Sequence, residues 1–268
     1  MKALVTLIAL AGATAANAQT GFTTGSGQAS VALPGLTLNV FTYKPANCTP
    51  RQLLVVFHGL GHEAAPYLNY ARPLADRFCA ALIAPEYDAQ RFPTAVYQHG
   101  GSTIDTVLPL VDWARAALGQ PAMPYDLIGH SAGAQFLSRV AAYGTLPAAH
   151  IVIANPSTWV MPNTSDAVPY GFGGMANAEQ ALRGYLARPV VALLGTADTG
   201  SKDLSTTRQA MAQGATRIER GRNAFAKARA MAQERGWAFG WTLVEVPGVG
   251  HSASKMFGSA EAAQALGK

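Results

Sequence analysis

The sequence predicts a protein of the α/β class, in which helices cover both faces of a mostly parallel β-sheet. Short apolar runs rich in Val, Ile and Leu alternate along the chain with segments of helical periodicity. Such runs are typical of strands that a parallel sheet buries on both faces. No internal repeat, low-complexity tract or linker divides the chain, so we expect residues 19–268 to form a single domain.

The strands can be placed from the apolar pattern. Alternation over residues 36–43 indicates an early antiparallel strand, and we expect the preceding residues 21–30, rich in Gly, Ser and Thr, to be a mobile leader. Buried strands are predicted at residues 53–57, 81–84, 125–128, 151–154, 190–194 and 241–246.

Helical periodicity fills the segments between these strands. We predict helices at residues 104–118, 134–142, 217–235 and 252–266. Residues 156–189 form the one large insertion, which we expect to be a short cap holding the aromatic residues Trp159, Tyr170 and Phe172. These three aromatics are candidates for lining a substrate pocket, as are Tyr67, Tyr87 and Tyr97; the alternative is plain core or surface packing.

The first eighteen residues have the pattern of a signal peptide. Lys2 supplies a basic start, residues 3–11 are apolar, and Ala16-Asn17-Ala18 forms a cleavage site, so the mature chain is expected to begin at Gln19. The apolar run is shorter than the roughly 20 residues that cross a bilayer. We therefore expect a secreted or periplasmic protein without membrane insertion.

The two cysteines fit an oxidising compartment. Cys48 and Cys79 each precede a predicted strand, and these strands would be neighbours in the sheet. A disulfide between them would stabilise the fold by about 3 to 4 kcal/mol in the chain-entropy model. The alternative is a pair of free buried thiols.

The charge is concentrated in one segment. The chain carries a formal charge of +5, and residues 202–235 contain eight basic residues against three acidic ones. This segment is either a set of solvated helix faces or a patch that attracts an anionic substrate or polymer. Nucleic acid is a poor candidate, since the run lacks interleaved aromatics and known nucleic-acid motifs are absent from the sequence.

Residues 129–133 read Gly-His-Ser-Ala-Gly and follow the predicted strand 125–128 directly. A strand that enters such a sequence predicts a nucleophile elbow, a tight turn that exposes the serine oxygen. Gly129, Ala132 and Gly133 must be small because larger side chains would collide with the adjoining strands. We predict that Ser131 is the nucleophile; the alternative is a Gly-rich loop that happens to contain serine.

Two further residues follow predicted strands near the C-terminus. Asp198 comes just after strand 190–194, and His251 comes after strand 241–246 in a Gly-rich loop. Carboxyl ends of parallel strands meet at one edge of the sheet, where open α/β sheets bind their ligands. We predict that His251 is the general base for Ser131 and that Asp198 orients it; as alternatives, Asp198 forms a turn and His251 caps a helix.

The loop after strand 53–57 completes the predicted site. It reads His58-Gly59-Leu60-Gly61-His62, and the backbone N–H groups of Leu60 and Ala132 are expected to form the oxyanion hole. The spacing of His58 and His62 would suit a metal only on a helix, so we expect no metal and no cofactor.

Together these motifs resemble the α/β-hydrolase superfamily, and within it the exported esterases related to polyhydroxyalkanoate depolymerases. The resemblance runs from residue 53 to the C-terminus and is carried by residues 56–59, 129–133, 195–198 and 248–251. It implies an α/β-hydrolase fold and a serine esterase that acts without a cofactor. Alternatives left open are a depolymerase of an aliphatic polyester or of a polyanion such as poly(aspartate), and a non-catalytic binding module.

Overall fold

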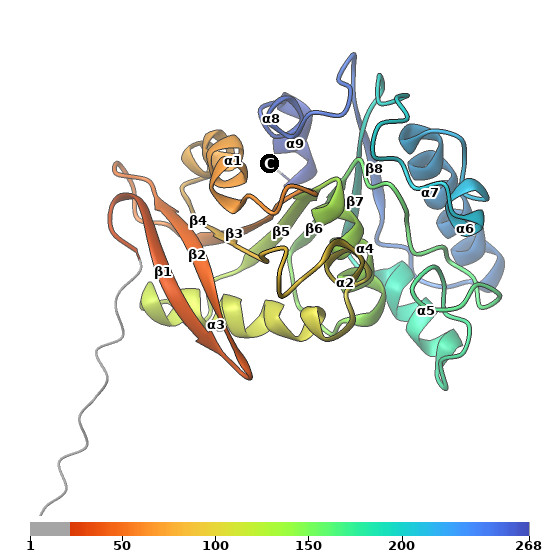
Figure 1. Ribbon diagram of the computed structural model, residues 1–268, viewed down its shortest axis with the longest axis horizontal. Helices are drawn as coiled ribbons and strands as arrows, with labels where there is room; N and C mark the ends of the chain where they lie inside the picture. Colours follow the sequence, from red (N-terminus) through yellow and green to blue (C-terminus); the bar gives the residue numbers. More distant parts are fainter. Residues whose placement is uncertain (1–21, 268) are drawn as a thin grey trace, which may run out of the picture.

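An eight-stranded sheet forms the centre of the computed structural model, which describes residues 22–267 (Figure 1). The strand order is β1-β2-β4-β3-β5-β6-β7-β8. The strands are β1 (Gly25–Leu33), β2 (Leu36–Lys44), β3 (Gln52–Phe57), β4 (Ala80–Pro85), β5 (Tyr125–His130), β6 (His150–Ala154), β7 (Val190–Gly195) and β8 (Thr242–Val246).

The sheet is mostly parallel, as the apolar runs predict. β3 to β8 pair in parallel, whereas β1 and β2 form an antiparallel edge and β2 pairs antiparallel with β4. All seven predicted strands are present, with bounds that differ by at most two residues. The prediction worked because buried strands must be apolar on both faces.

The prediction of a mobile leader at residues 21–30 is wrong. β1 begins at Gly25 and pairs with β2 along its whole length, and its Val31 and Leu33 are buried. Only every second residue of this edge strand faces the core, and the hydrogen bonds to β2 come from its backbone. Small polar residues are therefore compatible with it.

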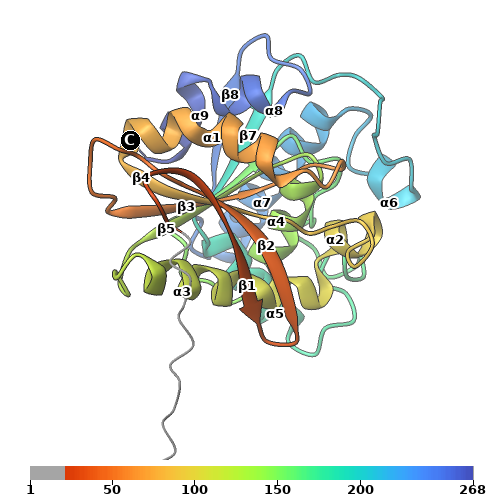
Figure 2. The same ribbon diagram turned by 60° about the vertical axis from the view of Figure 1, so that its left-hand side comes forward.

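Helices cover both faces of the sheet, as Figures 1 and 2 show. One face is covered by α1 (Ala64–Phe78), α8 (Ala253–Phe257) and α9 (Ala260–Ala265), which share one apolar cluster with the sheet. The other face is covered by α3 (Val107–Ala117), α4 (Ala132–Tyr143), α5 (Ala178–Ala187) and α7 (Arg217–Arg235). The short helices are α2 (Thr94–His99), η1 (Gly101–Thr106) and α6 (Arg208–Met211).

The helix predictions differ from the structure in detail. α7 has the predicted bounds, but the helix predicted at 104–118 begins as the 3₁₀ helix η1 before it becomes α3. The helix predicted at 252–266 is interrupted after Phe257, where the Ser259 side chain accepts a hydrogen bond from the Ala262 N–H and starts α9. The insertion 156–189 is irregular up to α5.

The parallel arrangement brings five loops to one edge of the sheet. β3, β5, β6, β7 and β8 all point their carboxyl ends the same way, with Phe57 opposite Gly129 and Gly195 opposite Val246. The loops that carry the predicted catalytic residues therefore leave the sheet side by side.

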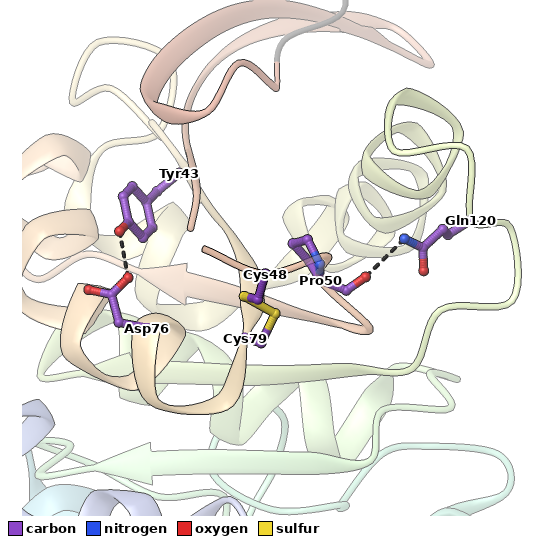
Figure 3. The surroundings of a disulfide bond; sticks show 6 residues. All are labelled: Tyr43, Cys48, Pro50, Asp76, Cys79 and Gln120. Carbon is purple, nitrogen blue, oxygen red and sulfur yellow. Dashed lines mark hydrogen bonds between the residues drawn. A yellow bond between two sulfur atoms is a disulfide. The ribbon is translucent and has the colours of Figure 1, made fainter. Parts of the chain in front are cut away.

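A disulfide joins Cys48 and Cys79 at the opposite, amino end of β3 and β4 (Figure 3). It confirms the predicted pairing, and it lies near the hydrogen bonds from Tyr43 to Asp76 and from the Gln120 amide to the Pro50 carbonyl. The bridge ties the C-terminal end of α1 to the segment that enters β3.

The predicted signal peptide, residues 1–18, lies outside the described residues. Within residues 22–267, no helix has the length and hydropathy needed to cross a bilayer.

Candidate active site

Ser131 occupies a strained turn between β5 and α4. Its backbone angles are φ 58° and ψ −114°, a conformation that non-glycine residues rarely adopt. The turn places the serine at the N-terminus of α4, beyond the carboxyl end of the central strand. This is the geometry that the Gly-His-Ser-Ala-Gly sequence predicts for an elbow.

The two glycines of the elbow allow the close approach of three backbone segments. A Cβ atom on Gly129 would lie 2.6 Å from the Gly133 carbonyl, and one on Gly133 would lie 2.3 Å from the Phe57 carbonyl oxygen. Real Cβ atoms do not approach backbone this closely, so neither position accepts a larger residue without displacing β3 or α4.

The three residues with predicted catalytic roles lie in one chain of hydrogen bonds. The His251 Nε2 atom lies 3.0 Å from the Ser131 Oγ atom, and the His251 Nδ1 atom lies 2.7 Å from Asp198 Oδ2. An ionised carboxylate can only accept, so Nδ1 carries the proton of the neutral ring. The lone pair of Nε2 therefore faces the serine hydroxyl, as general base catalysis requires.

The loops that carry Asp198 and His251 are tied together by backbone hydrogen bonds. The Ala197 N–H donates to the Val249 carbonyl at 3.0 Å, and the Gly248 N–H donates to the Thr196 hydroxyl at 2.8 Å. Asn155, which follows β6, accepts from the Gly195 N–H at 2.8 Å. The sequence reasoning missed Asn155, whose positive φ of 50° marks a built turn.

His130, inside the elbow, packs against the imidazole of His251 with ring centroids 4.5 Å apart. It is buried, and burial holds its pKa well below the ordinary value, so the ring stays neutral beside His251. This position gives His130 a packing role beside His251.

The side chain of His58 holds the peptide group between Gly59 and Leu60. The Tyr87 N–H donates to His58 Nε2 at 3.1 Å, so His58 Nδ1 carries the proton and donates to the Gly59 carbonyl at 2.9 Å. The His62 N–H donates to the same carbonyl at 3.2 Å. In a trans peptide the C=O and the following N–H point in opposite directions, so these contacts also fix the direction of the Leu60 N–H.

Two tyrosines hold the preceding peptide group of the same loop. The Tyr97 hydroxyl donates to the His58 carbonyl at 3.0 Å, and the Tyr67 hydroxyl accepts from the Gly59 N–H. A Cβ atom on Gly59 would lie 2.2 Å from that hydroxyl oxygen, which explains the glycine. The Gly59 N–H is thus already engaged, and the next donor along the loop is Leu60.

Leu60 and Ala132 are the predicted oxyanion donors. Ala132 is the first residue of α4, where N–H groups have no partner within the helix, and Leu60 lies at the exposed tip of the loop after β3. The metal alternative for His58 does not hold, because both of its ring nitrogens are engaged in hydrogen bonds.

The structure corrects the predicted substrate pocket. Trp159 and Phe172 are fully buried, and they pack against the core rings of Trp241 and Tyr185, respectively. A side chain without exposed surface cannot line a pocket, so the packing alternative applies to both. Tyr170 is half-buried, with the Arg139 guanidinium 5.8 Å from its ring centroid.

Tyr87 and Tyr97 are buried as well, and Tyr67 is half-buried. Their hydroxyl groups bind Thr106, the His58 carbonyl and the Gly59 N–H. All three support the loop after β3 and the segment after β4. Burial corrects the assignment of Tyr87 and Tyr97 to the pocket.

The basic residues of segment 202–235 divide into a buried group and an exposed group, so neither interpretation, solvated helix faces or a patch for an anionic substrate, covers them all. Arg217 and Arg220 are buried, and their guanidinium groups donate to backbone carbonyls. The exposed members are Lys202, Arg208, Arg222, Lys227, Arg229 and Arg235. Of these, Arg222 pairs with Glu245 and Arg235 pairs with Glu179.

A cavity of about 310 Å³ opens beside the imidazole of His251. Its lining comes from the loop after β7 and the start of α7, and the exposed charged side chains in it are Lys202 and Asp203. The imidazole of His251 therefore has one side open to a polar space.

Comparison with solved structures places these features among known hydrolases. Poly(aspartic acid) hydrolase-1 from Sphingomonas sp. KT-1 is 30% identical over 90% of this chain and 98% of its own, with a TM-score of 0.84. A poly(3-hydroxybutyrate) depolymerase from Bordetella parapertussis is 27% identical over 92% of both chains, also with a TM-score of 0.84.

A more distant structure, from Xanthomonas campestris, is an α/β serine hydrolase without a lid. It is 18% identical over 91% of this chain and 93% of its own, with a TM-score of 0.53, and supports the fold alone. No protein-family model and no curated protein matches the chain. The likeness to the Sphingomonas enzyme extends over nearly the whole of both chains. The chain therefore belongs to the α/β-hydrolase superfamily.

Proposed function

We propose that this protein is an exported carboxylic ester hydrolase that works through an acyl-enzyme on Ser131. The observation that carries the proposal is the position of His251, whose two ring nitrogens lie 3.0 Å from the Ser131 hydroxyl and 2.7 Å from the Asp198 carboxylate. A serine needs such a base to become nucleophilic at neutral pH.

The proposed reaction begins when Ser131 Oγ attacks the ester carbonyl carbon and its proton passes to His251 Nε2. Asp198 stabilises the imidazolium, and the N–H groups of Leu60 and Ala132 stabilise the oxyanion, each worth about 3 kcal/mol in the transition state. The imidazolium then donates its proton to the leaving alcohol as the C–O bond breaks. Water, deprotonated by His251, attacks the acyl-enzyme and releases the acid, and Ser131 regains its proton.

Export is part of the proposal. The signal-peptide pattern of residues 1–18 and the disulfide between Cys48 and Cys79 support it, because disulfides persist in oxidising compartments.

The test uses purified mature protein, a fluorophosphonate and a panel of p-nitrophenyl esters from acetate to palmitate. We expect one adduct on Ser131 and turnover of at least one ester. We expect Ser131→Ala and His251→Ala to lower turnover by roughly six orders of magnitude, and Asp198→Asn by about four. Absence of both labelling and turnover would favour a binding module.

The Asp203→Asn variant provides a matched control for Asp198→Asn. Asp203 lines the same cavity as Asp198 but is exposed and makes no contact with His251 among the hydrogen bonds and ion pairs of residues 22–267. Asp203→Asn should retain most of the activity. A large loss in Asp203→Asn together with retained activity in Asp198→Asn would transfer the acid role to Asp203.

Hydrolysis of a polymer is the second candidate. Two observations favour it: the relatives from Sphingomonas and Bordetella are named for poly(aspartic acid) and poly(3-hydroxybutyrate), and the exposed Lys202 lines the cavity beside His251. Added salt should slow hydrolysis of poly(aspartate) while leaving a neutral ester unaffected, because salt screens charges on the surface. Lys202→Gln should weaken the salt dependence, and a polyester film tests the neutral polymer.

A further inference from the structure

Asp198 and Arg217 form a pair of opposite charges that is almost completely buried. Both side chains are 1% exposed, and the Arg217 Nη1 atom lies 3.5 Å from Asp198 Oδ1. The other carboxylate oxygen, Oδ2, accepts from His251. Each oxygen of the carboxylate therefore faces one specific partner, and Arg217 is the partner that carries a permanent charge.

A carboxylate at this depth needs a positive partner. Removing an ionised carboxylate from water costs several kcal/mol unless a charge or several hydrogen bonds compensate it. The resting imidazole of His251 is neutral and supplies one N–H. The guanidinium of Arg217 supplies the charge, and it favours the ionised form of Asp198.

Arg217 is also fixed in place by the loop that follows Asp198. Its Nη2 atom donates to the Lys202 carbonyl at 2.6 Å, and its Nη1 atom donates to the Gly200 carbonyl at 3.3 Å. Arg217 is the first residue of α7, directly after Thr216, whose side chain caps the helix. The rigid start of a long helix thus holds the guanidinium against the carboxylate.

We propose that Arg217 is a positioning residue for Asp198: it keeps the buried carboxylate ionised and holds the loop after β7, so that Asp198 can orient His251. The proposal rests on the proposed function, because it concerns the acid of the same hydrogen-bonded chain. Arg217 does not touch the serine, and it acts through Asp198.

The proposal predicts a direction for the pH dependence. A positive charge beside the Asp198–His251 pair disfavours a further proton on it, and protonation of either group stops proton transfer from Ser131. The acidic limb of the kcat/KM profile should therefore move to higher pH without that charge. The other charged or titratable groups around the pair are His130, Lys202, Asp203 and Arg220, and all of them remain in the Arg217 variants.

The experiment compares wild-type enzyme with Arg217→Gln, which keeps a donor for the loop carbonyls, and Arg217→Lys, which keeps the charge. On a neutral p-nitrophenyl ester, we expect Arg217→Gln to shift the acidic limb of the kcat/KM profile to higher pH by about one unit. The loss of activity should appear mainly in kcat, with a smaller change in KM. Arg217→Lys should restore the wild-type limb.

Arg220→Gln is the matched control. Arg220 is buried on the same helix and donates to the carbonyls of Gly214, Ser157 and Ser205, and it forms no ion pair within residues 22–267. Its loss should lower stability without moving the limb. An unmoved limb in Arg217→Gln, or an equal shift in Arg220→Gln, would overturn the proposal.

A stability cycle covers the case in which Arg217→Gln does not fold. The proposal expects Arg217→Gln to lower the free energy of unfolding less in an Asp198→Asn background than in the wild type. Equal losses in the two backgrounds would overturn it. If wild-type enzyme neither reacts with the fluorophosphonate nor hydrolyses any ester, the proposed function fails. If it does both and the limb is unmoved, only the role of Arg217 fails.

Discussion

The backbone N–H of Tyr87 donates to Nε2 of His58 at 3.1 Å, and this contact fixes which nitrogen of the ring carries the proton. The proton must be on Nδ1, from which it is donated to the Gly59 carbonyl at 2.9 Å. Protonation of Nε2 would place two donors against each other. The neutral ring of His58 is therefore a structural part of the loop that carries Leu60.

The first prediction concerns the pH dependence of stability. Burial lowers the pKa of His58 from 6.5 to about 4. The unfolded chain therefore binds the proton first, and the stability contributed by neutral His58 is complete above about pH 6.5 and falls toward pH 4. The loss from this residue should reach about 3 kcal/mol at pH 4.

Urea unfolding at pH 7 and pH 4 measures this loss. His58→Asn keeps a donor near the Nδ1 position but does not titrate, so its stability should fall by about 3 kcal/mol less than that of the wild type over this range. Equal losses in both proteins would show that His58 does not link protonation to folding.

A second prediction separates support of the loop that carries Leu60, the proposed oxyanion donor, from general stability. Tyr97→Phe removes the hydrogen bond to the His58 carbonyl, whereas Tyr87→Phe removes a bond to Thr106. Both rings are fully buried, so each change should cost about 1 kcal/mol of stability. Only Tyr97→Phe should lower kcat, by about five- to tenfold with little change in KM, because of the two hydroxyl groups only that of Tyr97 binds the loop that carries Leu60.

Steady-state kinetics on a p-nitrophenyl ester, with thermal unfolding in parallel, tests this pair. Equal kcat values in the two variants would mean that the Tyr97 contact does not orient the proposed oxyanion donor, Leu60.

The strands and the residues that follow them were predictable because burial and topology leave a strong pattern. Apolar runs mark strands covered on both faces, and Ser131, Asp198 and His251 each follow such a run. β1 was not predictable in the same way, because its stability comes from backbone pairing with β2. α1 was also missed; it contains Pro66 and Pro73, which obscure a helical pattern.

Long-range contacts account for the other misses. Arg217 stands in a basic run that looks like a solvated helix face, and its partner Asp198 lies on a different loop. The sequence reveals that Trp159 and Phe172 are aromatic, but it does not reveal that the rings of Trp241 and Tyr185 pack against them. Burial of a polar or aromatic side chain is set by the tertiary fold, which local pattern does not encode.

The third prediction tests the close approach at the elbow. Gly133→Ala places a Cβ atom 2.3 Å from the Phe57 carbonyl oxygen, and backbone cannot yield there without separating α4 from β3. We expect a loss of about 3 kcal/mol or more. In the control, Gly184→Ala on α5, the added Cβ meets no atom within 4 Å and should stabilise the helix by about 0.5 to 1 kcal/mol.

Chemical denaturation of the two variants measures both effects. If Gly133→Ala were as stable as the wild type, the Phe57 carbonyl of β3 would have to lie farther from Gly133 than the structure places it.

The fourth prediction separates stability from activity. Cys48 and Cys79 close a loop at the amino end of β3 and β4, whereas Ser131, Asp198 and His251 lie at the carboxyl end of the sheet. Replacing both cysteines by serine should lower the free energy of unfolding by about 3 to 4 kcal/mol, because the unfolded chain gains the entropy of an open loop. The kcat at 25 °C should be unchanged while the protein remains folded.

Urea unfolding with and without a reducing agent provides the measurement. The reducing agent should destabilise the wild type toward the level of the double variant and leave that variant unaffected. A fall in kcat at a temperature where the double variant is fully folded would contradict the prediction. Such a fall would mean that loss of the disulfide at the amino end of β3 displaces the loop that follows its carboxyl end. β3 is six residues long and buried, and a rigid strand of this kind should prevent such a displacement.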